Sequence, residues 1–495
     1  MSVEARSFVE TARREKLREL AELGIAPFAY RYQRTHTAAQ VLSAYRPDTA
    51  EASVRIAGRL VALRGHGKTT FAHLTDASET IQLYFRRDVL GEAGYALVKL
   101  LDLGDHIGVA GEVFQTNSGE TTIRAREITL LAKALRPPPL GKEDAAGEQH
   151  GTLSDPELRY RQRYADLAVH PKVREVFALR ARVISFIRRF LDSRGYLEVE
   201  TPVLQPLYGG AMARPFVTHH NALDTDLYLR IATELYLKRC IVGGMERVYE
   251  IGKDFRNEGV DRLHNPEFTM LELYEAYADY TDIMALLEQM VAGVVSEFFG
   301  VHAIERFGKT FNFAPPWRRV AWLELLREHS GIDLRSADDR GLRAALERRG
   351  VPEAASLPRT RLVDELFKAY VEPHLEQPTL VTDYPIEISP LAKPKRGDAT
   401  LAERFELFVH GRELANAFSE LNDPDDQRRR FEAQAAARKA GDEEAQQLDE
   451  DYIRALEFGM PPTGGLGLGI DRLVMVLAGE VSIRDVILFP TLRPE

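Results

Sequence analysis

The chain has 495 residues, enough for two or three domains with a large hydrophobic core. Hydrophobic residues make up 44% of it and charged residues 28%, as is typical of soluble globular proteins, and no apolar run is long enough to span a bilayer. The single cysteine excludes a disulfide framework within the chain, and the net charge of −10 excludes a global electrostatic attraction to nucleic acid, so any RNA contact must use local basic patches.

The N-terminal residues 1–50 are predicted to form a helical extension. Phe8, Leu17, Leu20 and Leu23 lie among charged residues in a pattern that predicts an amphipathic helix. The segment is rich in arginine, but its several glutamates argue against a transit peptide, which would be poor in acidic residues. Together with the cysteine content, this favours a reducing, cytoplasmic location.

Residues 51–136 contain five short segments in which apolar and polar residues alternate. They are Val54–Val61, Thr70–Leu74, Ile81–Phe85, Ile107–Gln115 and Thr121–Leu131. Five short strands separated by turns predict a small β-barrel, and their order resembles an OB-fold, a module that binds single-stranded nucleic acid by stacking bases on aromatic side chains. From the pattern alone, Phe71 would be interpreted as a core aromatic.

A proline-rich break follows the predicted barrel. The run Arg136–Gly141 contains three prolines in a row and disrupts regular structure, and polar residues continue to Thr152. We therefore expect a linker over residues 137–154 and a second domain over residues 155–495.

The second domain is predicted to mix helices with an antiparallel sheet. Long helices are expected from Pro171 to Arg194, where Gly195 follows, and over residues 280–300. Cys240 lies in a helical apolar pattern and is predicted to fill core space. Residues 301–385 are interpreted as an insertion of short helices and loops, and the charged run Asp425–Tyr452 as a solvated surface helix.

The most informative segment runs from Phe255 to Tyr274. In its second half Phe268, Met270, Glu272 and Tyr274 share one parity, so a strand would place them on one face. Its first half is predicted to place Arg256 and Glu258 on one face of a preceding strand. Two strands joined by a cationic loop form a platform for an anionic, aromatic ligand such as a nucleotide. The alternative interpretation is an ordinary hairpin with one wet face.

A second hairpin carries two glutamates. A turn at Val409-His410 would make Glu406 and Glu413 direct cross-strand partners, which is destabilising unless a cation lies between them. Mg²⁺ suits paired carboxylates together with phosphate oxygens, whereas the alternative is two solvated edge acids.

Farther along the same strand, Asn416, Phe418 and Glu420 alternate on one face, opposite in parity to Glu413. A bulge near Leu414-Ala415 would be needed to bring all four side chains into one site.

Three segments together resemble the class II aminoacyl-tRNA synthetases. Phe190–Pro202 is similar to motif 1, Phe255–Tyr274 to motif 2, and the glycine-rich Gly464–Leu473 to motif 3, in the family's order. The amino-acid sequence of motif 2, in which Leu263 is inserted before the histidine, is close to the lysyl-tRNA synthetase version. The family commonly has proline where this chain has Thr233, which is a good helix N-cap. Residues 1–50 and 301–385 match least.

The resemblance implies a function for many single residues. The implied lysine-binding residues are Gly210, Glu234, Arg256, Glu272, Tyr274, Asn416, Phe418 and Glu420, and the implied ATP-binding residues are Arg256, Glu258, His264, Phe268, Glu406, Glu413, Gly469 and Arg472. Arg256, Glu258 and Arg472 are the implied catalytic residues, Glu406 and Glu413 the implied ligands of several Mg²⁺ ions, and Arg64, Phe71 and Gln82 the implied readers of the anticodon. Glu420 would take the ε-ammonium group of lysine, because a desolvated carboxylate needs a cationic partner.

The implied reaction has two steps. The carboxylate of lysine attacks the α-phosphate of ATP, with Arg256 and Mg²⁺ stabilising the transition state, and pyrophosphate leaves. The terminal ribose hydroxyl of tRNA(Lys) then takes the lysyl group from the adenylate. Motif 1 resembles the family's dimer interface, so a homodimer is expected.

Other functions fit the sequence less well. An aspartyl or asparaginyl synthetase would share the barrel and motifs, but an aspartate pocket needs a basic residue at position 420. A ligase that modifies elongation factor P with lysine would lack the barrel, and a lipid-aminoacylating enzyme would need transmembrane helices. A non-catalytic RNA-binding paralogue would usually have lost a motif residue, and Arg256, Glu258, Glu406, Glu413 and Arg472 are all present.

Overall fold

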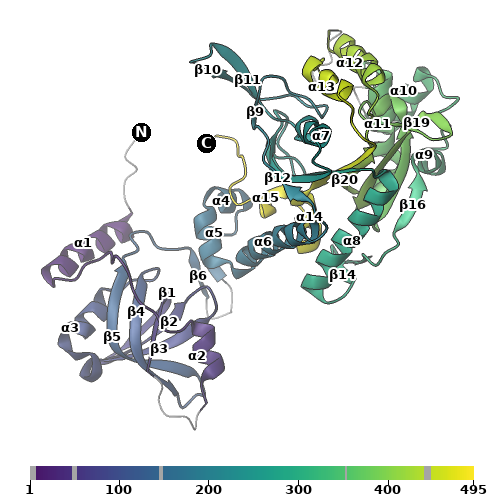
Figure 1. Cartoon of the computed structure of the whole chain (residues 1–495). Coiled ribbons are helices and arrows are strands. Elements are labelled where there is room, and N and C mark those ends of the chain that lie inside the picture. The colour runs from purple at the N-terminus through teal and green to yellow at the C-terminus, as the bar shows by residue number, and fades with distance from the viewer. Residues whose placement is uncertain (1–6, 47–52, 144–148, 352–353, 440–446, 495) are drawn as a thin grey trace. The chain divides into compact units, whose positions relative to one another are not determined.

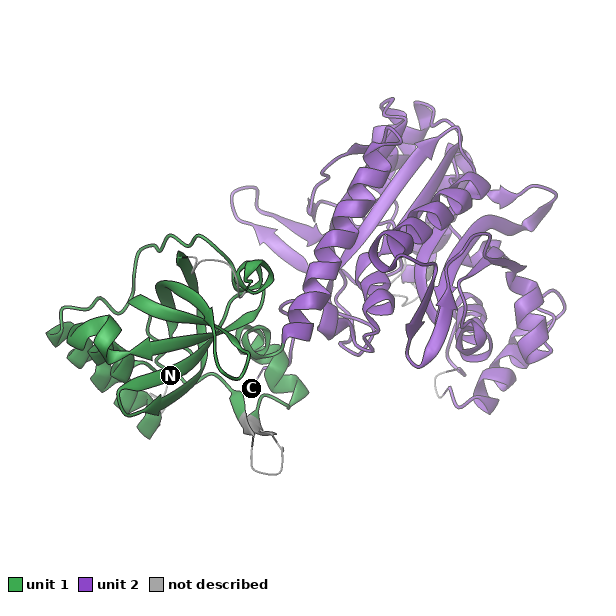
Figure 2. Ribbon diagram, turned by 90° about the horizontal axis from the view of Figure 1, so that it is seen from below, with its two compact units in different colours: residues 1–170 green, residues 171–495 purple. Residues whose placement is uncertain are grey.

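The computed structural model describes residues 7–46, 53–143, 149–351, 354–439 and 447–494 (Figure 1). The chain divides into two compact units, Met1–His170 and Pro171–Glu495 (Figure 2). The helices α4 (Pro156–Arg161) and α5 (Arg163–Val169), expected at the start of the second domain, belong by their contacts to the first unit. Within the described ranges, no helix combines the length and apolar character that crossing a membrane requires.

The first unit is built on a closed five-stranded barrel, as the sequence predicted. Its strands are β1 (Ser53–His66), β2 (Thr69–Thr75), β3 (Thr80–Arg86), β4 (His106–Gln115) and β5 (Thr121–Ala132), in the order β1-β2-β3-β5-β4, with α3 (Arg87–Leu100) between β3 and β4. Alternate side chains of these strands fill the interior, which is why the period of two was visible in the sequence. The strand β1 is longer than expected because its first half pairs with β4 and its second half, whose end is exposed, pairs with β2.

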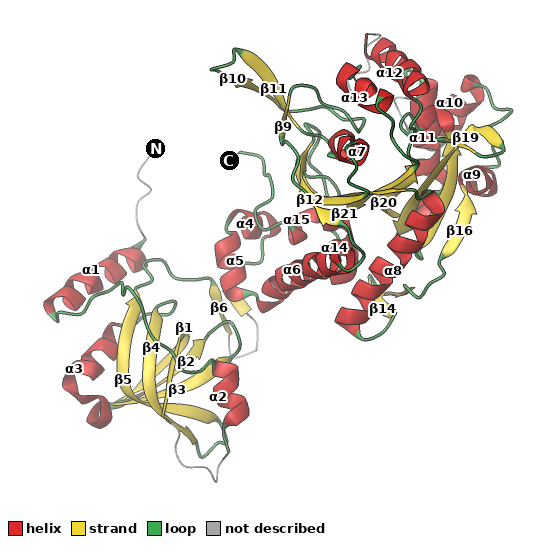
Figure 3. Cartoon of the chain, viewed as in Figure 1, coloured by secondary structure: helices red, strands yellow, loops and turns green. Residues whose placement is uncertain are grey.

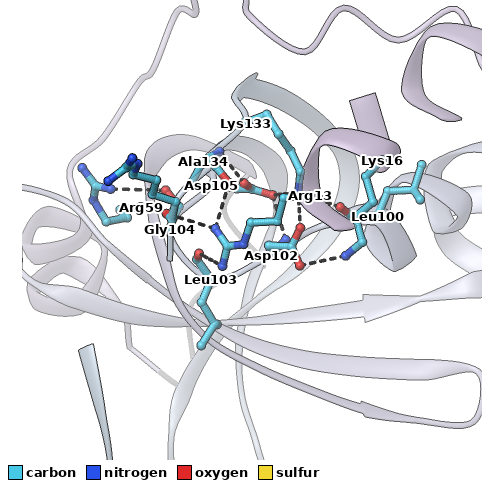
Figure 4. Close-up of polar contacts among 11 residues, drawn as sticks. Arg13, Lys16, Arg59, Leu100, Asp102, Leu103, Gly104, Asp105, Lys133 and Ala134 are labelled. Atoms are coloured by element: carbon cyan, nitrogen blue, oxygen red, sulfur yellow. Dashed lines mark hydrogen bonds and ion pairs between the residues drawn. The ribbon is translucent and has the colours of Figure 1, made fainter. Parts of the chain in front are cut away.

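The predicted N-terminal helix is present as α1 (Phe8–Glu22), followed by α2 (Ala38–Ala44). Leu20 is buried, but Phe8 and Leu23 are exposed, so the apolar face is narrower than the sequence suggested. Much of the attachment to the barrel is polar (Figure 4): the buried Arg13 donates to the carbonyl oxygens of Leu103 (3.0 Å), Ala134 (2.8 Å) and Arg136 (3.2 Å).

A second buried cation strengthens this attachment. Lys133 is fully buried and lies 2.6 Å from Asp102 and 2.7 Å from Asp105, while Lys16 of α1 pairs with Asp102 at 2.7 Å (Figure 4). Two lysines and two aspartates therefore compensate one another where the helix meets the barrel.

The second unit is built around a nine-stranded sheet that is mostly antiparallel (Figure 3). Its strand order is β16 (Arg318–Ala321), β17 (Thr379–Pro385), β19 (Asp398–Val409), β20 (Arg412–Ser419), β21 (Thr463–Gly469), β13 (Glu267–Ala276), β12 (Arg247–Phe255) and β8 (Leu197–Glu198), with β18 (Pro394–Lys395) beside β19. Only the two outermost neighbour pairs along this order are parallel. The combination of a five-stranded barrel and a mostly antiparallel sheet covered by helices confirms the predicted α+β class.

Helices cover the sheet differently on its two faces. The helices α6 (Pro171–Asp192), α8 (Tyr280–Phe299) and α14 (Ile470–Ala478) share one core with Leu271 and Leu273 of β13. The opposite parity of β13 faces α7 (Glu234–Val242) and the pocket described below. Alternate residues of β13 thus contribute to the hydrophobic core on one face of the sheet and to the pocket on the other.

The strands β6 (Leu140–Glu143) and β7 (Gln149–Thr152) form a two-stranded sheet of their own in the first unit. The remaining elements of the second unit are β9 (Leu204–Gln205), β10 (Val217–His220), β11 (Thr225–Leu229), β14 (Ala303–Arg306), β15 (Lys309–Asn312), α9 (Trp322–Ser330), α10 (Asp339–Arg348), α11 (Arg359–Tyr370), α12 (Pro424–Lys439), α13 (Glu450–Glu457) and α15 (Ile483–Val486), with short 3₁₀ turns at Glu372–His374 and Ile386–Ile388. Residues 301–385 were expected to be an insertion of helices and loops, but two strands of this region, β16 and β17, belong to the central sheet. The four residues of β16 were too few to show a strand pattern.

Candidate active site

A large pocket of about 660 Å³ opens in the second unit, on the face of the sheet opposite the core that α6, α8 and α14 share. Strands β13, β20 and β21, the loop after β12 and helix α11 contribute to its lining. All fifteen residues of this unit that the sequence singled out line it: Gly210, Glu234, Arg256, Glu258, His264, Phe268, Glu272, Tyr274, Glu406, Glu413, Asn416, Phe418, Glu420, Gly469 and Arg472. Residues separated by more than 250 positions in the chain therefore share one site.

The cationic loop between β12 and β13 forms one wall. Arg256 and Glu258 were expected on a strand, but β12 ends at Phe255 and both lie just beyond it. The Arg256 amide donates to the Pro266 carbonyl (2.9 Å), which closes the base of the loop, and the guanidinium carbon lies 5.0 Å from the centre of the Phe268 ring. Arg256 Nε donates to the Ile231 carbonyl oxygen (3.4 Å), and a guanidinium held over an aromatic ring can offer its terminal N–H groups to an anion.

The same loop reaches the helix that follows the glycine-rich strand. His264 is exposed, with Nδ1 2.9 Å from Asp261 and Nε2 3.3 Å from Arg472 Nη2. Arg472 also donates to the Glu413 carbonyl oxygen (2.9 Å) and lies 3.2 Å from the Glu413 carboxylate. These contacts bring motif 2, motif 3 and the acidic hairpin together at the mouth of the pocket.

The deep end of the pocket is lined by acidic side chains. Tyr274 donates to Glu272 Oε2 at 3.2 Å, and the Thr233 amide donates to Glu272 Oε1 at 3.4 Å. Burial, with the nearby charges of Asp254 and Glu234, raises the pKa of Glu272 to about 8. Burial thus disfavours the ionised form of Glu272, and a cationic ligand beside it would favour that form.

Glu420 lies at the bottom of this acidic end and is 1% exposed. Its Oε1 accepts no hydrogen bond from any described residue, and a Cβ atom at Gly465 would overlap both Oε1 and the Tyr274 ring. Burial raises the pKa of Glu420 well above its ordinary value. A buried carboxylate oxygen without a donor, over a position that only glycine can occupy, is suited to a cationic ligand.

Lys238 is a charged residue that the sequence analysis did not identify. It is fully buried behind the pocket wall on α7, one turn after Glu234, with Nζ 2.5 Å from Glu234 Oε1 and in an ion pair with Glu420 Oε2. A lysine inside a helical pattern usually marks a solvated face, but its spacing of four residues from Glu234 was a usable signal.

The acidic hairpin differs from its prediction in register. Glu406 is opposite Asn416 and Glu413 is opposite Phe408, so the two glutamates are not direct cross-strand partners. The register shifts at Leu414, which is where a bulge was predicted, and this shift brings Glu413 to the same side as Asn416. The expected pair is separated because the turn lies at His410-Gly411, one residue later than predicted, which places Glu413 opposite Phe408.

Glu406 is held by groups that the sequence analysis missed. It accepts from Arg404 Nη2 (2.6 Å) and from the Tyr384 hydroxyl (2.7 Å), and Arg404 Nε donates to Asn416 Oδ1 (2.9 Å). Burial raises the pKa of Glu406 to about 7, opposed by Arg404 and reinforced by Glu413. Burial, with Glu406 and Glu413, raises the pKa of Glu372 to about 8.

These carboxylates suit a hard divalent cation whose other ligands come from the substrate. Across the described ranges, no three histidine, cysteine, aspartate or glutamate side chains are grouped tightly enough to form a complete metal site. Mg²⁺ commonly uses one or two carboxylates together with phosphate oxygens and water, so the donor set of Glu406 and Glu413 fits it.

Thr233 occupies the N-cap position of α7, as expected, but does not cap the helix. Its side chain makes no cap hydrogen bond, and Oγ1 has no partner among the described residues. Its backbone is helical (φ −93°, ψ −10°), whereas a capping threonine needs an extended backbone, which explains the difference.

In the first unit, Arg64, Phe71 and Gln82 lie on one surface of the barrel. Phe71 is exposed and stacks on Tyr84 with ring centres 4.6 Å apart, so it is not a core aromatic. Arg64 is directly opposite Phe71 on the neighbouring strand. Gln82 donates to Glu120 (2.6 Å) and accepts from Thr122 (2.7 Å). The surface thus offers a stacking platform beside a cation and a polar side chain with a fixed orientation.

Comparison with known proteins covers both units. Residues 155–493 match the model of a family described as tRNA synthetases class II (D, K and N), and residues 54–131 match an OB-fold nucleic acid binding domain. The chain is 54% identical to a lysine–tRNA ligase of Moorella thermoacetica, with 100% of both chains covered. It is 54% identical to the lysine–tRNA ligase of Pelotomaculum thermopropionicum (97% of this chain, 94% of that one) and 52% identical to that of Carboxydothermus hydrogenoformans (97% of each).

Proposed function

Because this chain belongs to the class II tRNA synthetases of the D, K and N group, we propose that it is a lysine–tRNA ligase, which activates L-lysine with ATP and transfers it to tRNA(Lys). The observation that carries the choice of lysine is Glu420, whose buried carboxylate keeps one oxygen free at the bottom of the pocket. An aspartate or asparagine substrate would present an anion or a neutral amide to this acid, which is unfavourable in a desolvated site.

The lysine substrate would lie along the acidic end of the pocket. Glu420 binds the ε-ammonium group at the bottom, beside the Tyr274 ring, and Phe418 supplies apolar contact for the methylene chain. Glu234 and Glu272 bind the α-ammonium group, with Gly210 at the pocket wall. Asn416 and Arg256 bind the carboxylate.

Activation of lysine needs orientation and charge stabilisation more than a protein nucleophile. Arg256 binds the α-phosphate where negative charge develops, and Glu258, His264 and Arg472 line the path of ATP, whose adenine stacks on Phe268. Glu406 and Glu413 would hold Mg²⁺, which when bound screens the phosphate charge, and Gly469 lies beside Arg472. The in-line attack of the lysine carboxylate then follows from positioning, and the products are lysyl-adenylate and pyrophosphate.

The barrel would recognise the anticodon of tRNA(Lys). Phe71 stacks on a base, Gln82 reads a base edge, and Arg64 binds a base or a phosphate. We further propose that the protein acts as a homodimer through α6 and β8, and that it works in the cytoplasm, where its tRNA partner is found.

Amino-acid-dependent ATP–pyrophosphate exchange, run with each of the twenty amino acids and Mg²⁺, tests this function. Exchange with lysine alone is the expected result. Exchange with aspartate or asparagine would retain the family and overturn the assignment of Glu420, and no exchange by the folded protein would favour a non-catalytic role.

A further inference from the structure

Lys238 takes no part in the reaction as described above, yet it contacts two residues that do. It is 0% exposed and does not line the pocket. Its ammonium group lies 2.5 Å from Glu234, pairs with Glu420, and is 5.3 Å from the Phe418 ring and 5.9 Å from the Tyr274 ring. A lysine of the protein itself therefore already contacts the glutamates proposed for the two ends of the substrate.

The charges at this end of the pocket do not balance without a ligand. Glu234, Glu272 and Glu420 all line this end of the pocket, and one resident ammonium group, that of Lys238, pairs with Glu234 and Glu420. If all are ionised, two negative charges remain, and lysine brings two ammonium groups. The other ionisable groups near them are the guanidinium of Arg404, the carboxylate of Asp254, and the phenols of Tyr274 and Tyr452.

We propose that Lys238 is a positioning residue that sets the charge of the lysine pocket. It neutralises one of the three carboxylates, so that the site without ligand can accept two cationic groups. It also links Glu234 to Glu420, which fixes the positions of the two carboxylates that would bind the two ammonium groups of the substrate. The inference rests on the proposed function, because it takes lysine as the ligand.

The protonation of the cluster follows from this arrangement. Burial lowers the pKa of Lys238, but the carboxylates of Glu234 and Glu420 outweigh it and raise the pKa above the ordinary lysine value, so Lys238 stays charged. Burial raises the pKa of both glutamates, and Lys238 opposes that rise. Without Lys238, the pair would retain an additional proton at neutral pH, and lysine would have to displace it on binding.

Proton release on lysine binding distinguishes this role from a merely structural one. Calorimetric titration of wild type and Lys238→Gln with lysine, near pH 7 in two buffers of different ionisation enthalpy, counts the protons released. We expect Lys238→Gln to release about one proton more than wild type for each lysine bound. Its affinity for lysine should therefore increase up to about tenfold more per unit of rising pH than that of wild type. The control Lys253→Gln changes a partly exposed lysine of β12 outside the pocket and should match wild type. Equal proton counts in wild type and Lys238→Gln would overturn the proposal.

A second pair of variants covers the case in which Lys238→Gln does not fold. Glu420→Gln and the double variant Lys238→Gln/Glu420→Gln differ only in whether Lys238 is present. In the double variant Glu234 has lost its lysine partner, but the variant buries one carboxylate fewer than Lys238→Gln does. The double variant should release about one proton more than the single variant at saturating lysine. An equal count contradicts the role of Lys238, whereas failure of the wild-type protein to bind lysine contradicts the proposed function instead.

Discussion

The two ends of the pocket use the same residue type under different conditions. At the deep end, Glu234 and Glu420 are buried and share Lys238, a cation that belongs to the chain. At the outer end, Glu406 is paired with Arg404. The Glu413 side chain is 41% exposed and pairs with Arg472, which also contacts His264. The deep end thus holds fewer cations than carboxylates and would suit an organic cation as ligand, whereas at the outer end phosphate and water could complete the coordination of a metal.

The largest effect should come from removing the free acid of the deep end. Glu420→Gln is expected to lower kcat/KM for lysine by about 10²–10³-fold, because the ε-ammonium group loses its charge partner in a desolvated site, with little change in the KM for ATP. Exchange kinetics with each substrate varied separately measure this, and Glu457→Gln, on the exposed end of α13, is the matched control. Equal losses for both substrates would remove the distinction between the two ends.

The outer end should respond to metal concentration instead. Glu413→Gln is expected to raise the Mg²⁺ concentration needed for half-maximal exchange by about 10–100-fold, because one carboxylate ligand becomes a neutral amide. The same titration on Glu420→Gln should give the wild-type Mg²⁺ requirement. A shifted requirement in both variants would show that the two ends act as one electrostatic unit.

The pH dependence of the Mg²⁺ requirement sharpens this further. The pKa of Glu406 is raised to about 7 without metal, so below that pH a proton competes with Mg²⁺ for the carboxylate, and above it the carboxylate is ionised. We therefore expect the Mg²⁺ requirement to rise by up to about tenfold per unit as pH falls from about 7 to about 6, and to level off above about 8. A requirement that does not change over this range would contradict the assignment.

The barrel provides a comparison outside the pocket. Phe71→Ala is expected to lower tRNA charging by about tenfold, since one stacked base is worth about 1–3 kcal/mol, while lysine-dependent exchange stays at the wild-type rate. Phe458→Ala, which changes an exposed aromatic of the second unit, is the control. A parallel loss of exchange would mean that the barrel surface does not act separately from the pocket.

The smallest effect is expected at Thr233. Thr233→Pro removes an amide whose bond to Glu272 is long, at 3.4 Å, and a hydroxyl without a partner among the described residues. The KM for lysine should change by less than about threefold, because such a bond contributes under about 1 kcal/mol. A tenfold change in steady-state KM would show that this amide fixes the orientation of Glu272.

The sequence predicted the strands best where one face of each is buried. The barrel, the β12–β13 hairpin and the bulge at Leu414 followed from alternation, because a period of two separates the face of Leu271 from that of Glu272. The pairing of Glu406 with Glu413 was wrong because the turn lies at His410-Gly411, one residue later than predicted, and a shift of the turn changes every cross-strand partner.

The contributions of Lys238, Arg404 and Tyr384 were missed for another reason. Each contacts a partner far along the chain or on a neighbouring strand, and although the spacing of Lys238 from Glu234 was a usable signal, nothing in the sequence indicates that Lys238 is buried and also pairs with Glu420. The roles of the pocket residues themselves remain predictions, since grouping shows where they lie and not what each binds.

The attachment of α1 has a consequence for the order in which the chain folds during synthesis. Arg13 emerges early from the ribosome, but the carbonyl oxygens that receive its guanidinium lie 90, 121 and 123 positions later. Arg13 therefore stays hydrated, and α1 cannot form these hydrogen bonds, until the last strand of the barrel has been synthesised. Docking of α1 then marks the completion of the barrel during translation, before most of the second unit has been made.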